Sequence, residues 1–230
     1  MKLMLTVLGE TGLRFFGKMS AANAHEIKNA LAIINENAGL LEDLVKLEKK
    51  GVLLDLARLK RIADKIKQQV MRADEIAKST NQFSHSVDQV HGPADLEQSL
   101  NLIKTMAMRF ATQRHIGIEV VPGQRPVTLP VQPFMLLHLL WLCLNSAMAS
   151  TNAEKTIRIT FNRTDSACRI RFGPLSHLET ATVEALTSSV ETAALLHPMG
   201  GKIEADLGRS DLVLSLMRNH RQEEERMTQE

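Results

Sequence analysis

Residues 21–44 read AANAHEIKNALAIINENAGLLEDL, and this stretch decides the architecture of the first part of the chain. Its apolar residues recur at alternating steps of three and four, which is the spacing of the stripe that an amphipathic helix buries against a partner. At about 100° per residue, His25 and Asn29 fall on the opposite, solvent-facing side, and Glu26 projects from the flank. The predicted buried stripe consists of Ala24, Ile27, Leu31, Ile34, Ala38, Leu41 and Val45.

The surroundings of His25 favour a chemical role over a merely solvated side chain. The same helix side is expected to carry Ala22, Ala32 and Glu36, so a docking protein would meet an imidazole framed by small residues, an acid and an amide. A neutral imidazole is a nucleophile near physiological pH, and it forms a covalent phosphoramidate. A neighbouring carboxylate such as Glu26 can orient the ring and take its proton.

A second helical pattern follows the glycine at position 51, with heptad-like apolar spacing and basic residues between. Two antiparallel helices result. One such hairpin has too little core alone, and pairing of two copies into a four-helix bundle buries both seams. The apolar positions of this second pattern are Leu56, Leu59, Ala63, Ile66, Val70, Ala73 and Ala77.

A breaker at residues 91–93 (HGP) marks the domain boundary, after which short strands and helices alternate. The fold class is therefore α+β: a helical domain over residues 1–91, an α/β sandwich over 92–218 and a charged tail over 219–230. We expect helices over residues 95–113, 131–150 and 178–196, and strands over 117–121, 156–162, 168–172, 202–206 and 212–217.

Composition limits the possible partners and location of the protein. The net charge of +2 argues neither for nor against nucleic acid, but the scarcity of aromatic residues weakens the case for a base-stacking surface, so we expect no nucleic acid partner. No apolar run is long enough to span a bilayer, so we expect a cytoplasmic protein without a membrane partner. Cys143 and Cys168 lie in apolar surroundings and are expected in the core. The remaining lone histidines lack metal-ligand spacing and are interpreted as structural or surface residues: His115, His138, His177 and His197.

Residues 21–44 resemble the phosphoacceptor helix of two-component sensor histidine kinases, whose H-box reads His-Glu-x-x-Asn/Thr-Pro-Leu. Ala30 replaces the proline, which should leave the helix straighter. The resemblance implies that His25 accepts a phosphoryl group, that Glu26 acts as base or orienter, and that Asn29 positions water for dephosphorylation.

Residues 72–76 (RADEI) and 81–84 (NQFS) resemble the second dimerisation helix of the same family, which again implies a homodimer. The family's partners are response regulator receiver domains.

The second domain resembles the ATP-binding domain of these kinases with several nucleotide contacts replaced. The N-box, Asn-Leu-Leu-x-Asn-Ala, matches residues 141–147: Asn145 takes the place of the second asparagine, and Trp141, which cannot ligate magnesium, stands at the first. The Asp-x-Gly-x-Gly motif is represented by residues 171–175 (RFGPL), which contain no acid, and a glycine-rich lid is absent. Residues 198–201 (PMGG) match a family turn, where glycine permits positive φ.

Three nucleotide contacts are thus lost, and we favour a fold kept without ATP over a diverged active kinase. Asn145 is either a remnant nucleotide ligand or an asparagine that cross-links local backbone. The leading hypothesis is a histidine phosphotransfer protein that holds no cofactor itself, with magnesium supplied by the receiver. The alternatives are a working kinase with an unusual ATP site, a pseudokinase that binds a receiver without accepting phosphate, and a receiver phosphatase that depends on Asn29.

Overall fold

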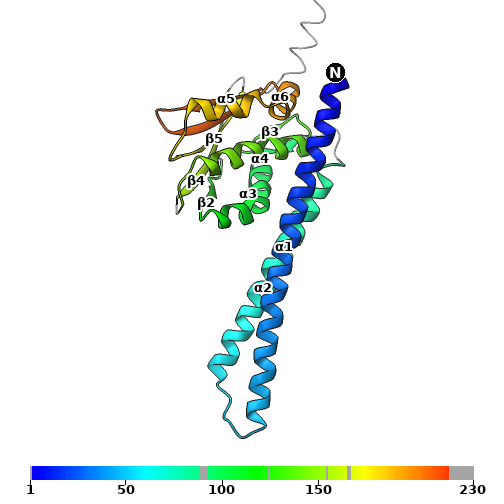
Figure 1. Cartoon of the computed structure of the whole chain (residues 1–230), viewed down its shortest axis with the longest axis vertical. Coiled ribbons are helices and arrows are strands. Elements are labelled where there is room, and N and C mark those ends of the chain that lie inside the picture. Colours follow the sequence, from blue (N-terminus) through cyan, green and yellow to red (C-terminus); the bar gives the residue numbers. More distant parts are fainter. Residues whose placement is uncertain (1, 89–92, 124, 154, 165–166, 218–230) are drawn as a thin grey trace, which may run out of the picture.

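The structure, a computed structural model, describes residues 2–88, 93–123, 125–153, 155–164 and 167–217. It consists of a long helical hairpin and an α/β sandwich packed beside one end of it (Figure 1). The hairpin is formed by α1 (Lys2–Glu48) and α2 (Leu56–His85). The predicted α+β architecture is confirmed, whereas the expected boundary at residues 91–92 and the tail at 219–230 lie outside the described residues.

The turn of the hairpin is closed by local hydrogen bonds on both sides. Gly51 has φ of +84°, and its N–H donates to the Glu48 carbonyl over 2.8 Å while the Val52 N–H donates to Leu47 over 3.2 Å. This is the Schellman arrangement, in which a glycine without a Cβ adopts the left-handed conformation that ends a helix. Asp55 then caps α2, since its carboxylate accepts from two N–H groups of the first turn.

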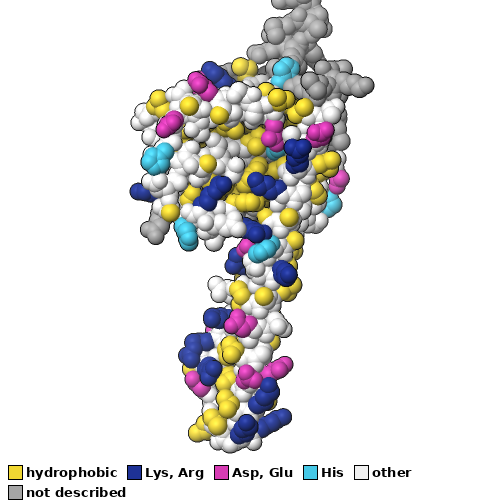
Figure 2. Space-filling model, in the orientation of Figure 1, with side chains coloured by type: hydrophobic (Ala, Val, Ile, Leu, Met, Phe, Trp, Pro, Cys, Tyr) yellow, Lys and Arg dark blue, Asp and Glu magenta, His cyan; other side chains and the backbone are white. Residues whose placement is uncertain are grey.

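The face of α1 that packs on α2 differs from the predicted stripe. Ala22 and Ala30 are buried, so the expectation that Ala22 faces solvent beside His25 was wrong. Leu31 and Val45, which were expected to be buried, are 55% and 49% exposed. The two faces are roughly 100° apart around the helix, and only one of them can meet α2. The predicted stripe therefore remains as a second, partly exposed apolar strip. Figure 2 shows apolar side chains on the surface along the hairpin.

The sandwich is built on a five-stranded sheet with the order β2-β4-β5-β7-β6. The parallel β2–β4 pair is joined to three antiparallel neighbours. Burial alternates along the strands with a period of two: Ile157 and Ile159 are buried while Arg158 between them is exposed. The strands are β2 (Gly117–Val120), β4 (Thr156–Arg163), β5 (Ala167–Gly173), β6 (Lys202–Asp206) and β7 (Asp211–Met217).

A small antiparallel pair, β1 (Ala94–Asp95) and β3 (Thr128–Leu129), was not predicted. Two-residue strands are too short to show an alternating pattern, so nothing in the sequence separates them from a loop. Their role is to fix the entry into α3 (Leu96–Gln113), whose N-cap Asp95 accepts a hydrogen bond from Gln98.

Four helices complete the domain: α3, α4 (Pro133–Ala149), α5 (Thr180–Ser188) and α6 (Val190–Leu196). The single helix expected over residues 178–196 is divided at Ser189, which has ψ of 135°. Ser189 caps α6 by accepting from Thr192, and this local bond competes with continuation of α5. A turn of 3₁₀ helix follows at His197–Met199, and Gly200 has the positive φ expected there.

An aromatic cluster fastens the hairpin to the sandwich. Phe15 of α1 packs edge-on against Phe83 of α2, with ring centroids 5.4 Å apart. Its face lies parallel to the ring of His138 in α4 at 4.4 Å, and Phe134 completes the group. Phe15, Phe83 and His138 are all nearly inaccessible to solvent. Within the described residues, no helix combines the length and apolarity that crossing a bilayer requires.

Candidate functional site

His25 is exposed on α1, as the helix pattern predicts. Asn29, one turn further along, places its Nδ2 3.1 Å from His25 Nδ1. An amide NH₂ only donates, so Nδ1 is the acceptor in this pair. The neutral ring then carries its proton on Nε2, the nitrogen for which the described part of the chain provides no hydrogen-bond partner.

The orientation of the Asn29 amide is fixed by Glu26. The same Nδ2 lies 3.4 Å from Glu26 Oε1. Turning the amide over would point its oxygen at a carboxylate oxygen, which is repulsive, so the donor orientation follows from the network. The structure thus brings together the three predicted site residues, His25, Glu26 and Asn29, with Asn29 touching both of the others.

Glu26 is tied to the second helix by Arg72, a residue that the sequence analysis did not place in the site. Arg72 Nη2 donates to Glu26 Oε2 over 2.6 Å, and the Glu26 side chain is only 18% exposed. Such a charge-assisted bond holds the carboxylate in one position. A signal existed in the hairpin register, because antiparallel pairing about residue 51 brings α2 residues in the seventies next to Glu26.

A second polar contact fastens the sandwich close to the histidine. Asn23 is buried, and its Nδ2 donates over 2.8 Å both to Thr80 Oγ1 on α2 and to Met106 Sδ on α3. Three helices therefore meet less than one turn of α1 from His25. The position of the sandwich relative to the histidine is set by contacts on α1 and α2 together.

Trp141 fills the place where the family's first N-box asparagine is expected. It is buried, its ring centroid is 4.9 Å from that of Phe110 in α3, and the Lys18 ammonium of α1 lies 4.8 Å from its ring. A cation over an indole face is a favourable contact. This position now serves packing between α1, α3 and α4.

Asn145 is engaged by a cation from the end of α3. Its Oδ1 accepts a hydrogen bond from Arg114 Nη1 over 3.3 Å. Of the two interpretations left open for Asn145, cross-linking and a remnant ligand, the contact shown is a cross-link, but to a side chain rather than to backbone.

Arg171, in the segment that matches the adenine-binding motif, forms ion pairs on the sheet. Its Nη1 lies 2.7 Å from Asp206 Oδ2 and 3.3 Å from Asp211 Oδ2. The hydrogen bond from Arg171 lowers the pKa of Asp206, and the bond to Asp206 raises the pKa of Arg171. Both carboxylates are paired with this cation.

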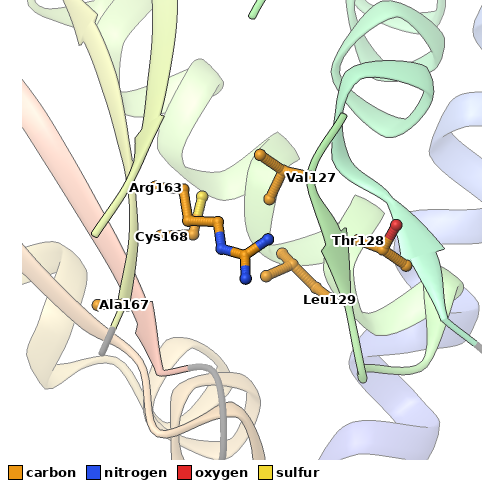
Figure 3. Close-up of a pocket in the computed structure, with 6 residues that line it drawn as sticks. All are labelled: Val127, Thr128, Leu129, Arg163, Ala167 and Cys168. Atoms are coloured by element: carbon orange, nitrogen blue, oxygen red, sulfur yellow. The ribbon is translucent and has the colours of Figure 1, made fainter. Parts of the chain in front are cut away.

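A shallow groove lies between β3 and the β4–β5 hairpin (Figure 3). Its volume is about 10 Å³, room for about one water molecule and far below the roughly 300 Å³ at which pockets for drug-sized ligands begin. Burial raises the pKa of the Cys168 thiol at its base to about 11, so the thiol is not a nucleophile at neutral pH. Cys143 is likewise buried, as predicted. The lining residues are Val127, Thr128, Leu129, Arg163, Ala167 and Cys168.

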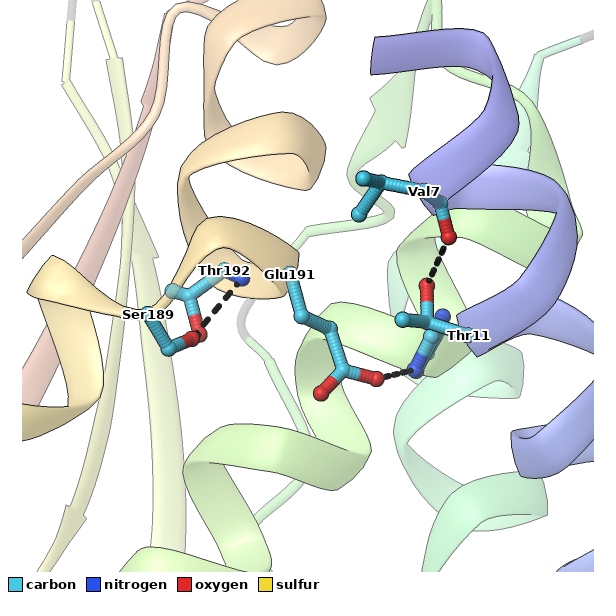
Figure 4. A network of polar contacts seen from close by, with 6 residues as sticks. Val7, Thr11, Ser189, Glu191 and Thr192 are labelled. Atoms are coloured by element: carbon cyan, nitrogen blue, oxygen red, sulfur yellow. Dashed lines mark hydrogen bonds and ion pairs between the residues drawn. The ribbon is translucent and has the colours of Figure 1, made fainter. Parts of the chain in front are cut away.

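His138 is the buried titratable group of the sandwich. Its Nε2 lies 2.8 Å from Glu191 Oε1, and Figure 4 shows Glu191 reaching from the start of α6 toward this contact beside α1. Burial lowers the pKa of His138, and the Glu191 carboxylate opposes that shift only in part. His138 is thus a structural residue, as interpreted from the sequence. Among the described residues, no group of three or more His, Cys, Asp or Glu could hold a metal ion.

No family model and no curated protein matches the chain. Among solved structures, it is similar to the histidine kinase AdeS of Acinetobacter baumannii (14% identity, 85% of this chain and 98% of that chain covered, TM-score 0.46). It is also similar to a bacterial phosphotransferase (15% identity, 88% and 95% covered, TM-score 0.48) and to a histidine kinase from Burkholderia phymatum STM815 (13% identity, 85% and 96% covered, TM-score 0.42). At these identities the likeness concerns the fold and not individual residues.

Proposed function

We propose that the chain is a histidine phosphotransfer protein, in which His25 takes a phosphoryl group from one receiver aspartate and gives it to another. The observation that carries the proposal is the exposed His25 ring, held at Nδ1 by Asn29 while Nε2 faces no partner within the described residues. An incoming receiver can approach Nε2 without displacing any described contact of this chain.

The transfer is a displacement at phosphorus. His25 Nε2 attacks the aspartyl phosphate, an N–P bond forms as the P–O bond to the aspartate breaks, and the aspartate leaves as a carboxylate. The proton on Nε2 must leave before the attack, because a protonated ring nitrogen has no lone pair to give. It moves through solvent, to which the ring is open, to Nδ1, where it takes the place of the Asn29 hydrogen bond, and it is lost to solvent once the N–P bond has formed. Catalysis of this kind depends mainly on positioning and on charge stabilisation, so a rigid helix surface is a suitable support.

Magnesium in this mechanism belongs to the receiver. Within this chain, the residues at the matching nucleotide positions do not fit Mg-ATP: an indole at Trp141 offers no oxygen ligand, and Arg171 adds a cation where adenine needs an acceptor. We therefore derive no step through ATP.

The attachment of the sandwich also supports transfer over kinase activity. A kinase must carry its bound ATP to the histidine, which requires the nucleotide domain to move. Here Phe15 and Asn23 on α1 hold the sandwich through buried contacts with α4 and α3. Leaving this position would expose the aromatic cluster to water, at a cost of the order of several kcal/mol.

We further propose that two copies pair through the apolar strip left on the hairpin. Leu31 and Val45 on α1, together with Val70 on α2, are about half exposed in the single chain. Packing these strips against their copies gives a four-helix bundle, the arrangement that hides the seams of two-helix hairpins.

The proposal is tested with a receiver domain that has been phosphorylated with labelled acetyl phosphate. Label should move to the wild-type chain as acid-labile, base-stable phosphate, and His25→Ala should abolish this transfer. Unchanged transfer to His25→Ala would refute the proposal.

Incubation with labelled Mg-ATP distinguishes the kinase alternative from phosphotransfer, since only a kinase labels His25 without a receiver. A receiver that binds wild type and His25→Ala equally, with no label moved, would indicate a pseudokinase.

Asn29 gives a second candidate activity, hydrolysis of the receiver's phosphate, because its amide lies beside the histidine. Asn29→Ala separates the two activities: loss of hydrolysis with transfer retained would assign the amide to water positioning.

A further inference from the structure

The far end of the hairpin carries a charge and apolar pattern that the phosphotransfer site does not use. We call residues 45–67 the basic tip. It holds eight Lys and Arg against three Asp and Glu, a net charge of +5. The whole chain carries only +2, so the remainder is net acidic at −3. Figure 1 shows this end of the hairpin projecting well away from the sandwich.

At the apex of the basic tip, large apolar residues are exposed to solvent. Leu53 is 96% exposed, Val52 is 51% exposed, and Leu56 at the start of α2 is 75% exposed. The loop is not loose, because the Gly51 turn and the Asp55 cap fix both of its ends. The turn therefore has a defined conformation, and it exposes apolar side chains at positions where turns usually carry polar residues.

Basic side chains surround this apex. Lys49 and Lys50 precede it, and Arg58, Lys60 and Arg61 follow on the first turns of α2; all five are exposed. Figure 2 shows apolar side chains at the end of the hairpin flanked by dark-blue basic ones. Apolar residues that enter the acyl boundary beneath a collar of Lys and Arg are the pattern of interfacial membrane contacts.

We propose that the basic tip docks on the surface of an anionic lipid bilayer, with Leu53 and its neighbours inserted among the lipid headgroups. The phosphates of a nucleic acid could pair with the basic residues, but a nucleic acid has no apolar layer into which the exposed leucines could insert. Residues 45–67 also contain no aromatic side chain to stack on a base. An apex that protrudes is also shaped to enter a bilayer rather than to receive a peptide. The proposal differs from the expectation of no membrane partner, and it requires no spanning segment.

Docking by the basic tip keeps the phosphoacceptor available. His25 lies 23 residues before Glu48, the last residue of α1, which corresponds to about 35 Å of helix. A hairpin standing on its tip therefore holds His25 well above the lipid, within reach of a soluble receiver. The proposal is independent of phosphotransfer, since it uses none of the residues around His25.

The test is co-sedimentation of the full chain with vesicles. We expect binding to phosphatidylcholine vesicles that contain about one-third phosphatidylglycerol and little binding to pure phosphatidylcholine. Raising the ionic strength from about 0.1 M to about 1 M, which shortens the screening length from about 10 Å to about 3 Å, should release the protein. Equal binding to both vesicle types, or binding to neither, would overturn the proposal.

Two variants address the two parts of the basic tip. Lys49→Gln with Lys50→Gln should lower the partition coefficient about 25-fold, at about fivefold for each basic residue. Leu53→Asp should lower it at least about tenfold, and the exposure of Leu53 means that folding is not at risk. The matched controls are Lys155→Gln with Lys202→Gln, and Leu207→Asp, which change exposed residues of the sandwich and should leave binding unchanged.

Other occupants of the basic tip give different results. If Leu53→Asp converts a dimer to a monomer in solution, a second copy covers the apex and the proposal is wrong. If Leu53→Asp binds vesicles as wild type does, the contact is only electrostatic, and the proposed insertion is overturned.

Discussion

Arg72 holds Glu26 from the second helix of the hairpin. Its guanidinium lies 2.6 Å from Glu26 and links the phosphoacceptor helix to α2. Both side chains are partly exposed, so this ion pair contributes little to stability, and its effect should appear in the reaction instead.

We expect Arg72→Gln to slow phosphoryl transfer about tenfold while the thermal midpoint stays within a few degrees of wild type, because a released Glu26 no longer fixes Asn29 and the ring. The rate is measured with the labelled receiver. Arg169→Gln, at an exposed position of β5, is the matched charge control. A wild-type rate in Arg72→Gln would show that Glu26 needs no support from α2.

His138 predicts how stability depends on pH. Burial lowers its pKa below the ordinary 6.5, so as pH falls the unfolded chain takes up the proton before the native state does. The stability that neutral, buried His138 contributes to the folded state is therefore fully present above about pH 6.5, and it is lost as pH falls toward the pKa of His138 in the native state.

We expect the thermal midpoint of the wild type to fall between about pH 7 and pH 5, and His138→Phe, which keeps a ring against Phe15, to show a smaller fall. His85→Gln, at an exposed position, should keep the wild-type profile. A midpoint that rises on acidification would mean that the ion pair with Glu191 outweighs burial.

The contrast between His25 and Arg72 shows what the sequence could reveal of the site. His25, Glu26 and Asn29 lie within five residues on one helix, so periodicity alone places them together. Arg72 comes from another helix, and its contact depends on the register of the hairpin. Ala22 was misplaced for the same reason, because the periodic pattern does not say which of two apolar faces meets α2.

At the scale of elements, Phe15 joins three helices that are distant in the sequence. It touches Phe83 of α2 and both Phe134 and His138 of α4, and it is 3% exposed. Removing the ring leaves a cavity at the junction between hairpin and sandwich.

Phe15→Ala should lower the free energy of unfolding by about 3–5 kcal/mol, as measured by urea denaturation. Leu13→Ala, two residues away and 75% exposed, should change it by less than about 0.5 kcal/mol. An unchanged free energy of unfolding in Phe15→Ala would show that the aromatic cluster does not hold the hairpin and the sandwich together.

Elements with their own periodic pattern were predicted within a few residues, α3 and β4 among them. The features that were not predicted from the sequence lack such a periodic pattern. The break at Ser189 depends on one side-chain bond to Thr192, and β1 is only two residues long. Local hydrogen bonds of this kind compete with regular structure without changing the hydrophobic period.

At the scale of the whole molecule, the hairpin has two apolar faces and only one partner helix. The face through Ala22 and Ala30 is occupied by α2, while the strip through Leu31 and Val45 is half exposed along α1. Exposed apolar strips of this length are unusual on monomers and mark interaction surfaces.

We expect the wild type to have the solution mass of a dimer and Leu31→Asp to have that of a monomer, as measured by light scattering after size exclusion. A charge in the seam of a four-helix bundle is buried without a partner, and the cost of that burial opposes association. Leu207→Asp, at a similarly exposed leucine in the turn after β6, should remain dimeric. Because α2 and the aromatic cluster lie on the other face, the Leu31→Asp monomer should retain its helical circular dichroism. A wild-type monomer would instead require that the strip serve another partner, and the receiver would be the first to test, since His25 lies on the same helix as the strip.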